Sequence, residues 1–435
     1  MSGIAYYAPD MLLVYTNEIT PRIEYTFNLV LGDILGLDFQ LITSEDAFEH
    51  YDGAKCCYSL KDVLGEYKLW PVHPLLFEQD IRPQELDEEK NDQVLKIHDP
   101  FASAFFIASR YEEYLPHEKD IFRRYEANQS ILYKKGILDF PVVHAWADGI
   151  LKTLKERFPL EKKDKHYAPV VTIDVDQAFS YKHKGLMWST FILLKNLVKK
   201  DKKSLFLQTK VLRGKLTDPF DSFSYLATIQ QVTGIRMIYF IHAGRRSKYD
   251  RPIPVRFRGI TRLVKAISQY AEVGLHPSFQ SNENDWMVKN EKMLLEKIIG
   301  KPVILSRQHY LRLSMPVTYR KLISEGIRED FTMGYATEPG FRAGLCIPFY
   351  WFDVKANHIT SLKIHPVSFM EGTFFQEKNF SPGLALDQMK KYIDTVKKYN
   401  GQLIAAWHNH TITDHGVWMG GKNVFEGMME KILDN

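Results

Sequence analysis

The stretch VVTIDVD, residues 170–176, runs from apolar β-branched residues directly into two carboxylates. Its apolar part has the composition of a strand buried on both faces. Ionised groups are too costly to bury unpaired, so a strand that ends on Asp174 and Asp176 must open onto a polar site. In α/β folds the active site lies at the carboxyl ends of the strands. The stretch therefore predicts an α/β fold with a functional site at the end of this strand.

Further short apolar runs follow this strand and alternate with helical patterns. The predicted strands lie in the segments IRMIYFIH, AEVGLHPS, KPVILSRQHYL, FTMGYA, IHPVSFM and QLIAAWHNH. Amphipathic segments such as TRLVKAISQYA and ALDQMKKYIDTVKKYN separate many of them. Repeated alternation of strand and helix is typical of a parallel sheet. We therefore predict a parallel (β/α) barrel over residues 167–435.

The first part of the chain predicts a smaller domain. A chain of 435 residues is too long for one ordinary core. MLLVYT and DFQLIT have the pattern of short strands, and a helical pattern lies between them. PFASAFFIASRYEEYL is predicted to be a helix with Arg110, Glu112 and Glu113 near its exposed end. The charged run LEKKDKH at 160–166 is the predicted linker. We expect an α/β or α+β domain over residues 1–160, followed by the barrel.

Composition and charge exclude several classes of protein. A formal net charge of +4 is small for this length and does not indicate a nucleic-acid binder. The three cysteines have no CxxC spacing, which favours a reducing compartment. The first residues lack a basic segment followed by an apolar one, so no signal peptide is expected. These observations predict a cytoplasmic protein without disulfides.

One segment raises the question of membrane contact. LMWSTFILLKNLVKK, residues 186–200, is interrupted by Lys195 and is shorter than the roughly 20 apolar residues that a membrane span requires. We predict no transmembrane segment here, and expect an amphipathic helix packed on the protein. Weak contact with a membrane surface is the alternative. Arg256, Phe257 and Arg258 offer a second place where an anionic substrate or lipid surface could be met.

Polar side chains recur where the predicted strands end. His276 follows one strand, Arg307 and His309 another, and His408 and His410 the last. Members of the same pair are two residues apart, so both side chains point to the same side of a strand. A single histidine at such a place is most often structural, and an aspartate after a strand is often a helix cap. The recurrence on successive strands favours one shared pocket.

The order of these motifs resembles that of a known family. TIDVD, GLHPS, SRQHY and AWHNH follow one another as in the polysaccharide deacetylases, the NodB-like carbohydrate esterases with a distorted (β/α) barrel. The resemblance covers residues 167–435, and its most specific part is TIDVD followed by GLH about a hundred residues later. The N-terminal part resembles the accessory domain that some bacterial deacetylase-like proteins carry.

The resemblance implies roles for individual residues. Asp174 corresponds to the catalytic base, Asp176 and His276 to metal ligands, and His408 to the general acid. A second metal-binding histidine is expected four residues after His276, but the chain has Gln280 there. His309 is the candidate for the missing ligand. Arg307 occupies the place of the motif arginine and is expected to orient Asp174 by a bidentate contact, with a structural salt bridge as the alternative.

The chemistry of this set favours a divalent cation. One carboxylate and two imidazoles leave coordination positions open, so the cation can polarise an amide carbonyl and lower the pKa of a water. Zinc suits such ligands, although other divalent metals bind them too.

The segment EPGFRAGLCIPFYWFD, residues 338–353, is the second informative stretch. Gly340 and Gly344 permit close backbone approach, aromatic rings such as Phe341 can stack on sugars, and Arg342 can contact an anionic group. An aromatic cluster of this kind is alternatively part of a core. We take Phe341 and Arg342, with Tyr310 and His410, as the candidate substrate-binding residues.

Three functions are compatible with these residues. The first is a metal-dependent deacetylase that removes an acyl group from an amino sugar of a glycan or glycan precursor. The second is another metal-dependent amidohydrolase of the same fold that acts on a C–N bond outside sugars. The third is a binding or scaffold protein on a degenerate deacetylase barrel, which the glutamine at position 280 keeps open.

Overall fold

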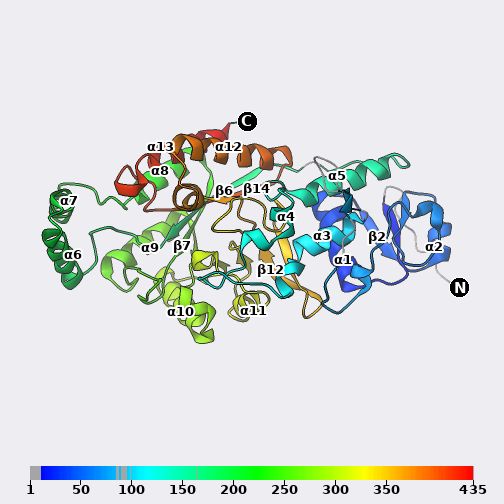
Figure 1. The fold of residues 1–435 in the computed structure, drawn as a ribbon, viewed down its shortest axis with the longest axis horizontal. Coiled ribbons are helices and arrows are strands. Elements are labelled where there is room, and N and C mark those ends of the chain that lie inside the picture. The colour runs from blue at the N-terminus through cyan, green and yellow to red at the C-terminus, as the bar shows by residue number, and fades with distance from the viewer. Residues whose placement is uncertain (1–10, 85–87, 90–95, 98, 164, 435) are drawn as a thin grey trace.

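A computed structural model describes residues 11–84, 88–89, 96–97, 99–163 and 165–434 of the chain. Figure 1 shows an elongated molecule with the N-terminal part at one end, a large sheet in the middle and the helices α6 and α7 at the other end. The first ten residues, part of the segment in which no signal peptide is expected, lie outside the described residues. So does Asp164 within the predicted linker.

The N-terminal part contains a small parallel sheet covered by helices. Its strands are β1 (Leu12–Tyr15), β2 (Phe39–Ile42) and β3 (Lys55–Cys57), in the order β2-β1-β3, and a separate two-stranded pair is formed by β4 (Glu88–Glu89) and β5 (Lys96–Ile97). Its helices are α1 (Pro21–Phe27), α2 (Glu45–Glu49), α3 (Pro100–Ala108), α4 (Ile131–Lys134) and α5 (Val142–Lys155). The Thr20 side chain caps α1 by accepting from the Ile23 amide, and Pro21 supplies the fixed dihedral that suits a first turn. The strands predicted from MLLVYT and DFQLIT are both present.

The C-terminal part is built on one nine-stranded sheet with the order β11-β12-β10-β9-β8-β7-β6-β14-β13. Its strands are β6 (Ala168–Val175), β7 (Arg236–Ile241), β8 (Glu272–Leu275), β9 (Leu305–Ser306), β10 (Glu329–Asp330), β11 (Phe349–Asp353), β12 (His358–Ile364), β13 (Phe369–Met370) and β14 (Gln402–His408). All neighbouring pairs are parallel except β11 with β12. The parallel α/β arrangement predicted from the alternation is therefore confirmed.

Two features of the sheet differ from the prediction. Among the described residues, the outer strands β11 and β13 do not pair with each other, so a closed barrel is not confirmed. The antiparallel β11–β12 hairpin is a second difference, because no strand is predicted from the sequence at Phe349–Asp353 or His358–Ile364. Side chains from β6, β7, β9 and β14 nevertheless meet in a separate small core that includes Val170, Ile238 and Ile404. The sheet is thus strongly curved, which brings the ends of distant strands together.

Helices cover the outer side of this sheet, as Figure 1 shows for α9, α12 and α13. They are α8 (Phe223–Thr233), α9 (Arg258–Tyr270), α10 (Asp285–Ile299), α11 (Val317–Ser324), α12 (Pro382–Lys398) and α13 (Gly421–Leu433). Two further helices, α6 (Leu186–Val198) and α7 (Lys202–Leu212), lie at the end of the molecule, away from the sheet (Figure 1). α9 illustrates why they form. Its buried residues Ile260, Val264 and Ile267 recur at intervals of three and four, which places them on one face of the helix.

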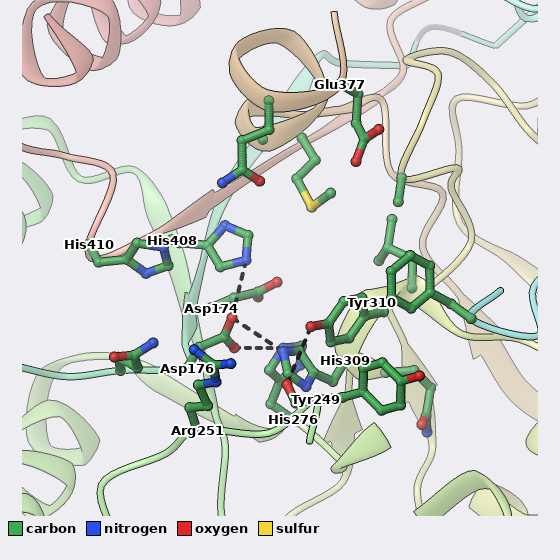
Figure 2. Close-up of a pocket in the computed structure, with 18 of the residues that line it drawn as sticks. Asp174, Asp176, Tyr249, Arg251, His276, His309, Tyr310, Glu377, His408 and His410 are labelled. Carbon is green, nitrogen blue, oxygen red and sulfur yellow. Dashed lines mark hydrogen bonds and ion pairs between the residues drawn. The ribbon is translucent and has the colours of Figure 1, made fainter. Parts of the chain in front are cut away.

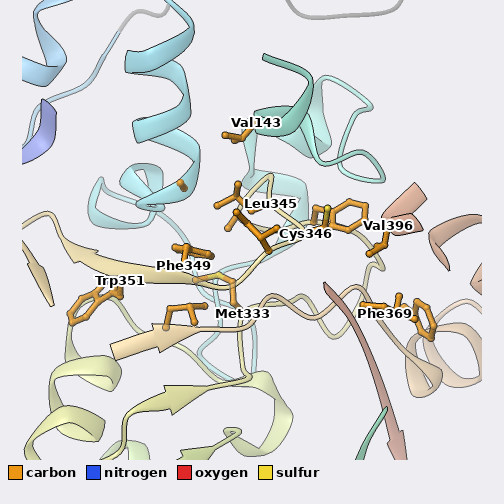
Figure 3. Close-up of a cluster of buried hydrophobic side chains, with 14 of the residues drawn as sticks. Val143, Met333, Leu345, Cys346, Phe349, Trp351, Phe369 and Val396 are labelled. Carbon is orange, nitrogen blue, oxygen red and sulfur yellow. The ribbon is translucent and has the colours of Figure 1, made fainter. Parts of the chain in front are cut away.

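The two parts share one hydrophobic core, and most of the segment 338–353 is buried in it. Figure 3 shows Val143 of α5 facing Leu345 and Cys346 from this segment. Gly344 has a φ of 63°, and a Cβ there would lie 2.8 Å from Ile107 and 3.1 Å from Val143. A Cβ on Gly340 would lie 2.4 Å from the Leu138 carbonyl oxygen. The predicted close approach is real, but its partner is the N-terminal part and not a ligand.

This packing corrects two predicted substrate contacts. Phe341 and Arg342 are fully buried, at 0% and 1% exposure, and neither lines the pocket described below. Phe341 packs in the shared core near Tyr392. Arg342 donates to Glu113 through Nε at 2.9 Å and Nη2 at 2.7 Å. Aromatic rings and a guanidinium in a glycine-containing segment suit a core as well as a sugar site, and only the tertiary neighbours distinguish the two.

Glu113 connects Arg342 with a second buried arginine. Arg110 donates to Glu113 through Nε at 2.8 Å and also donates to the Arg342 carbonyl oxygen. The expectation that Arg110 and Glu113 lie at an exposed helix end is therefore wrong, because each compensates the charge of the other inside the protein. Burial alone would raise the pKa of Glu113, but Arg342 and Arg110 lower it to about 2.

A Glu113→Gln substitution is expected to destabilise the protein by about 3–5 kcal/mol, because it leaves the buried Arg342 without its carboxylate and Arg110 with Glu112 alone. Urea denaturation of the variant and the wild type measures this loss. Asp148→Asn, which disrupts the half-exposed pair between Asp148 and Lys162, is the matched control and should change the midpoint little. An equal shift in the two variants would contradict a special role for Glu113.

The contacts of Glu113 with Arg110 and Arg342 predict that the stability of the protein depends on pH. The pKa of Glu113 is depressed in the folded protein, so its stabilisation is complete above the unfolded pKa of 4.5. It is lost as the pH falls from there towards 2. In this window the wild type should lose stability faster than Glu113→Gln.

Candidate active site

The predicted polar residues converge on one pocket of about 360 Å³ at the carboxyl ends of the parallel strands. Asp174 and Asp176 stand at the end of β6, His276 directly after β8, and His408 at the end of β14. Side chains alternate along a strand, so both aspartates point to the same side of β6. Figure 2 shows His408 and His309 approaching Asp176 from different directions.

Asp176, His276 and His309 form a group that fits a metal ion. One ligand atom from each lies within 4.8 Å of the other two. His276 Nε2 is 3.2 Å from Asp176 Oδ1, and His309 Nε2 is 3.4 Å from Asp176 Oδ2. Asp176 Oδ1 and His276 Nε2 are buried and lack a well-oriented hydrogen bond within the described protein. Buried polar atoms of this kind require a partner, and a cation would provide one.

The outer nitrogens of both histidines are held by other groups. His276 Nδ1 donates to the Arg307 carbonyl oxygen at 2.5 Å, and His309 Nδ1 donates to Asp250 Oδ1 at 2.8 Å. A proton on Nδ1 leaves the Nε2 lone pair free to bind a metal, and a carboxylate behind the ring makes that nitrogen a stronger ligand. Both Nε2 atoms face Asp176, as binding of a shared cation requires.

Asp250 also belongs to a second possible ligand group, with His242 and His309. Asp250 already accepts from His242 Nε2 at 2.9 Å and from the Phe279 amide at 2.9 Å, and Ser247 donates to its other oxygen at 2.7 Å. Neither His242 nor Asp250 lines the pocket. The group around Asp176 therefore fits a reactive cation better, and Asp250 supports His309 from behind.

Asp176 and His309 each stabilise the charged form of the other. Burial alone would raise the pKa of Asp176, but His309 and His276 hold it well below its usual range. Burial alone would lower the pKa of His309, but Asp176 and Asp250 raise it to about 9. A proton therefore competes with a metal for His309, so metal affinity should fall as the pH is lowered.

Asp174 is held by Arg307 beneath the pocket. Arg307 Nη1 donates to Asp174 Oδ1 at 3.0 Å and to Thr172 Oγ1 at 2.6 Å. The guanidinium is fully buried, and its Nε donates to the Phe331 carbonyl oxygen at 2.9 Å. The contact uses one nitrogen and is not the bidentate pair that was expected. It still fixes one carboxylate oxygen and leaves the other available to the pocket.

His408 lies beside Asp176 and is paired with Glu371. Its Nδ1 donates to Glu371 Oε1 at 2.7 Å, and its Nε2 is 3.6 Å from Asp176 Oδ2. Glu371 is fully buried. Burial alone would lower the pKa of His408, but Glu371 and then Asp176 raise it to about 10. His408 is thus protonated at neutral pH, with Nε2 directed at the reactive end of the pocket.

Aromatic rings form a further wall, and one of them comes from the N-terminal part. Tyr310 and His410 both line the pocket, as predicted for substrate contacts. The ring of Phe122 stacks on Tyr310 with centroids 5.0 Å apart. Arg124 donates to the Tyr310 carbonyl oxygen at 3.0 Å and so anchors this loop to the site. The N-terminal part is therefore a structural component of the pocket.

Several residues of the site could not be recognised from the sequence. Asp250 lies in a loop after β7 with no motif around it, and Phe122 lies in the part of the chain without a recognisable motif. Glu371 directly follows the two-residue strand β13, and no spacing rule connects it with His408. Gln280 is exposed and does not line the pocket, so the histidine expected at this position has no substitute there. His309 reaches Asp176 from a different strand end instead.

Comparisons with known proteins concern the two parts separately. Residues 12–159 match DUF7033, a family of unknown function. No protein with a curated description matches the chain.

Within the described ranges, none of the helices combines the length and the apolar character needed to cross a bilayer.

Solved structures resemble the larger part of the chain. A candidate polysaccharide deacetylase from Mycobacterium smegmatis is 13% identical over 63% of this chain and 87% of its own, with a TM-score of 0.42. A CE4 family pseudoenzyme from Bacillus anthracis is 9% identical over 64% of this chain and 67% of its own, with a TM-score of 0.31. A mutant of a CE4 family pseudoenzyme with restored enzymatic activity is 10% identical over 64% and 69%, with a TM-score of 0.29.

Proposed function

We propose that this protein is a metal-dependent hydrolase that removes an N-acyl group, such as acetyl, from an amino sugar of a glycan or glycan precursor. The observation that carries the proposal is the convergence of a three-residue metal-binding group with Asp174 and His408 in one pocket. Each of the two additional residues has a buried partner that holds it in place, Arg307 for Asp174 and Glu371 for His408.

Asp176, His276 and His309 would hold the cation, and zinc suits this combination of one carboxylate and two imidazoles. The cation, when bound, polarises the acyl carbonyl and makes a water molecule more acidic. With three protein ligands, such a cation would have coordination positions free for water and the acyl oxygen. His309 takes the place that Gln280 leaves vacant.

Asp174 acts as the general base and His408 as the general acid. Asp174 accepts a proton from water as the water oxygen forms a bond to the acyl carbon. His408 Nε2 donates its proton to the sugar nitrogen as the C–N bond breaks. The products are a free amine and a carboxylic acid, and proton exchange with solvent restores both side chains. Arg307 positions Asp174, while Glu371 positions His408 and favours its protonated form.

A sugar substrate is favoured by the lining of the pocket. Tyr249, Tyr310, Phe122 and Trp418 present aromatic surface, and Gln177, Gln308 and Gln376 present amide groups. Sugar rings stack on aromatic faces through their C–H groups, while their hydroxyls need hydrogen-bonding partners. This combination fits a carbohydrate better than a wholly apolar amide.

Metal analysis combined with an acetate-release assay tests this function. The protein is expected to purify with about one divalent ion per chain after growth with zinc, and to release acetate from N-acetylated sugars or their oligomers. Turnover of a simple non-sugar amide without acetate release from sugars would indicate the other amidohydrolase. A metal-free protein that binds sugars without turnover would indicate a scaffold.

Phe122→Ala is expected to raise KM for an N-acetylated sugar by roughly 3- to 10-fold while changing kcat much less, since the ring contributes a stacking surface and no chemistry. Steady-state kinetics separates the two constants. Ile121→Ala is the matched control, because Ile121 is the exposed neighbour in the same loop and does not line the pocket. Unchanged kinetics in Phe122→Ala would show that the N-terminal part does not contact the substrate.

A further inference from the structure

The helices α6 and α7 form a hairpin that projects from the end of the molecule farthest from the N-terminal part (Figure 1). None of the thirteen residues of α6, all of them described, is buried. The expected helix is present, but its main neighbour is α7 and its apolar side chains are not buried. It packs on α7, for example where Gln208 of α7 donates to the Ser189 carbonyl oxygen at 3.0 Å.

An apolar stripe follows the free side of α6. Its members Met187, Phe191, Leu194 and Val198 are exposed by 78%, 55%, 60% and 83%. Their spacing of four, three and four residues places them on one face of the helix. Leu186 and Leu197 extend the stripe, and Phe206 is a further exposed apolar side chain on α7. An apolar face of this extent calls for a partner.

Basic side chains surround the stripe. Residues 185–216 contain eight lysines and arginines and one aspartate, whereas the whole chain has a formal net charge of only +4. The positive charge of the protein is thus concentrated in the hairpin. Lys199, Lys200, Lys202 and Lys203 gather at the turn between the helices and are all exposed.

The basic surface continues from the hairpin towards the pocket. The Arg246 guanidinium lies 3.9 Å from the ring centroid of Trp188 in α6. Arg245, Arg246 and Arg256 line a groove of about 710 Å³ together with the exposed Trp286. The same loop carries Lys248 and Arg251, which line the candidate active site. Hairpin, groove and pocket are therefore neighbours.

We propose that the α6–α7 hairpin binds the surface of an anionic phospholipid bilayer. An apolar helix face flanked by lysines is the pattern of a helix that lies in the interface, with its apolar side chains among the acyl chains and its lysines at the headgroups. A second copy of the chain is a poorer partner, because it would bring two strongly basic hairpins together. The inference does not depend on the catalytic activity.

Vesicle co-sedimentation of the full chain tests the proposal. The protein is expected to bind vesicles of phosphatidylglycerol and phosphatidylcholine, to bind pure phosphatidylcholine much more weakly, and to be released by high salt. Phe191→Glu with Leu194→Glu should reduce binding at least roughly tenfold, because it places charge in the apolar stripe. Lys199→Gln with Lys203→Gln should weaken binding by roughly tenfold.

Val232→Glu with Val317→Glu is the matched control. These valines are 79% and 56% exposed on α8 and α11, away from the hairpin, so this variant should bind like the wild type. Circular dichroism and metal content confirm that each variant is folded. Failure of the wild type to bind anionic vesicles would overturn the proposal, as would equal binding by the hairpin and control variants. Light scattering that shows a dimer abolished by Phe191→Glu and Leu194→Glu, without vesicle binding, would assign the surface to a second copy.

Discussion

Asp176→Ala and His276→Ala proteins are expected to remain folded but to lose the divalent cation and, with it, hydrolysis. Removing a group that supports a metal ligand typically costs about 10- to 100-fold in affinity or activity, and removing a ligand should cost more than that. Asp176 contributes most, since it is the carboxylate that both histidines face. Metal analysis by mass spectrometry and zinc titration by calorimetry measure the loss.

Asp250→Asn provides a graded comparison for the metal site. It keeps the shape of the side chain but weakens the partner of His309 Nδ1, so zinc affinity should fall by about 10- to 100-fold. His358→Ala, at an exposed histidine in β12, is the control and should bind zinc like the wild type. Full zinc binding by both Asp176→Ala and His276→Ala would show that the cation lies elsewhere, for example between His242 and Asp250.

Asp174→Asn is expected to lower kcat by about 10²- to 10⁴-fold while leaving zinc binding intact, because an amide cannot accept the proton of the attacking water. The substitution is nearly isosteric, and its amide oxygen can still accept from Arg307. Metal affinity, which depends on Asp176, should therefore stay close to the wild-type value. This combination separates the general base from the ligands.

A second buried carboxylate serves as the control for Asp174. Asp330 is fully buried and accepts from Ser306 and Thr332, but it does not line the pocket. Asp330→Asn reports how much activity is lost when a buried carboxylate near the site is changed without a role in the chemistry. Equal losses of kcat in the two variants would rule against Asp174 as the base.

The parts of the fold that could be predicted from sequence have a local cause. β6 is recognisable because apolar β-branched residues run into Asp174 and Asp176, and carboxylates at the end of a buried strand require a polar site. The convergence of His276, Arg307 and His408 was predictable because parallel strands end on the same side of a sheet. These inferences need only the order of residues and the geometry of a strand.

The predictions that were wrong or missing also have a common cause. Phe341 and Arg342 have side chains that suit a sugar site, but they are buried against the N-terminal part. Asp250 and Glu371 support the site from loops and strand ends that no spacing rule connects with His309 or His408. In each case the decisive partner is far away in sequence.

The sequence by itself determined a parallel α/β protein with a polar, metal-compatible group of residues at the ends of its strands, because alternation and strand-end charges are properties of neighbouring residues. Only the tertiary structure decided which nitrogen each histidine turns towards Asp176, which carboxylates stand behind them, and that Phe122 closes the pocket from the other part of the chain. It also decided that the apolar face of α6 stays uncovered. Burial and hydrogen-bond partners depend on the packing of residues that are distant in the chain, and local patterns do not specify that packing.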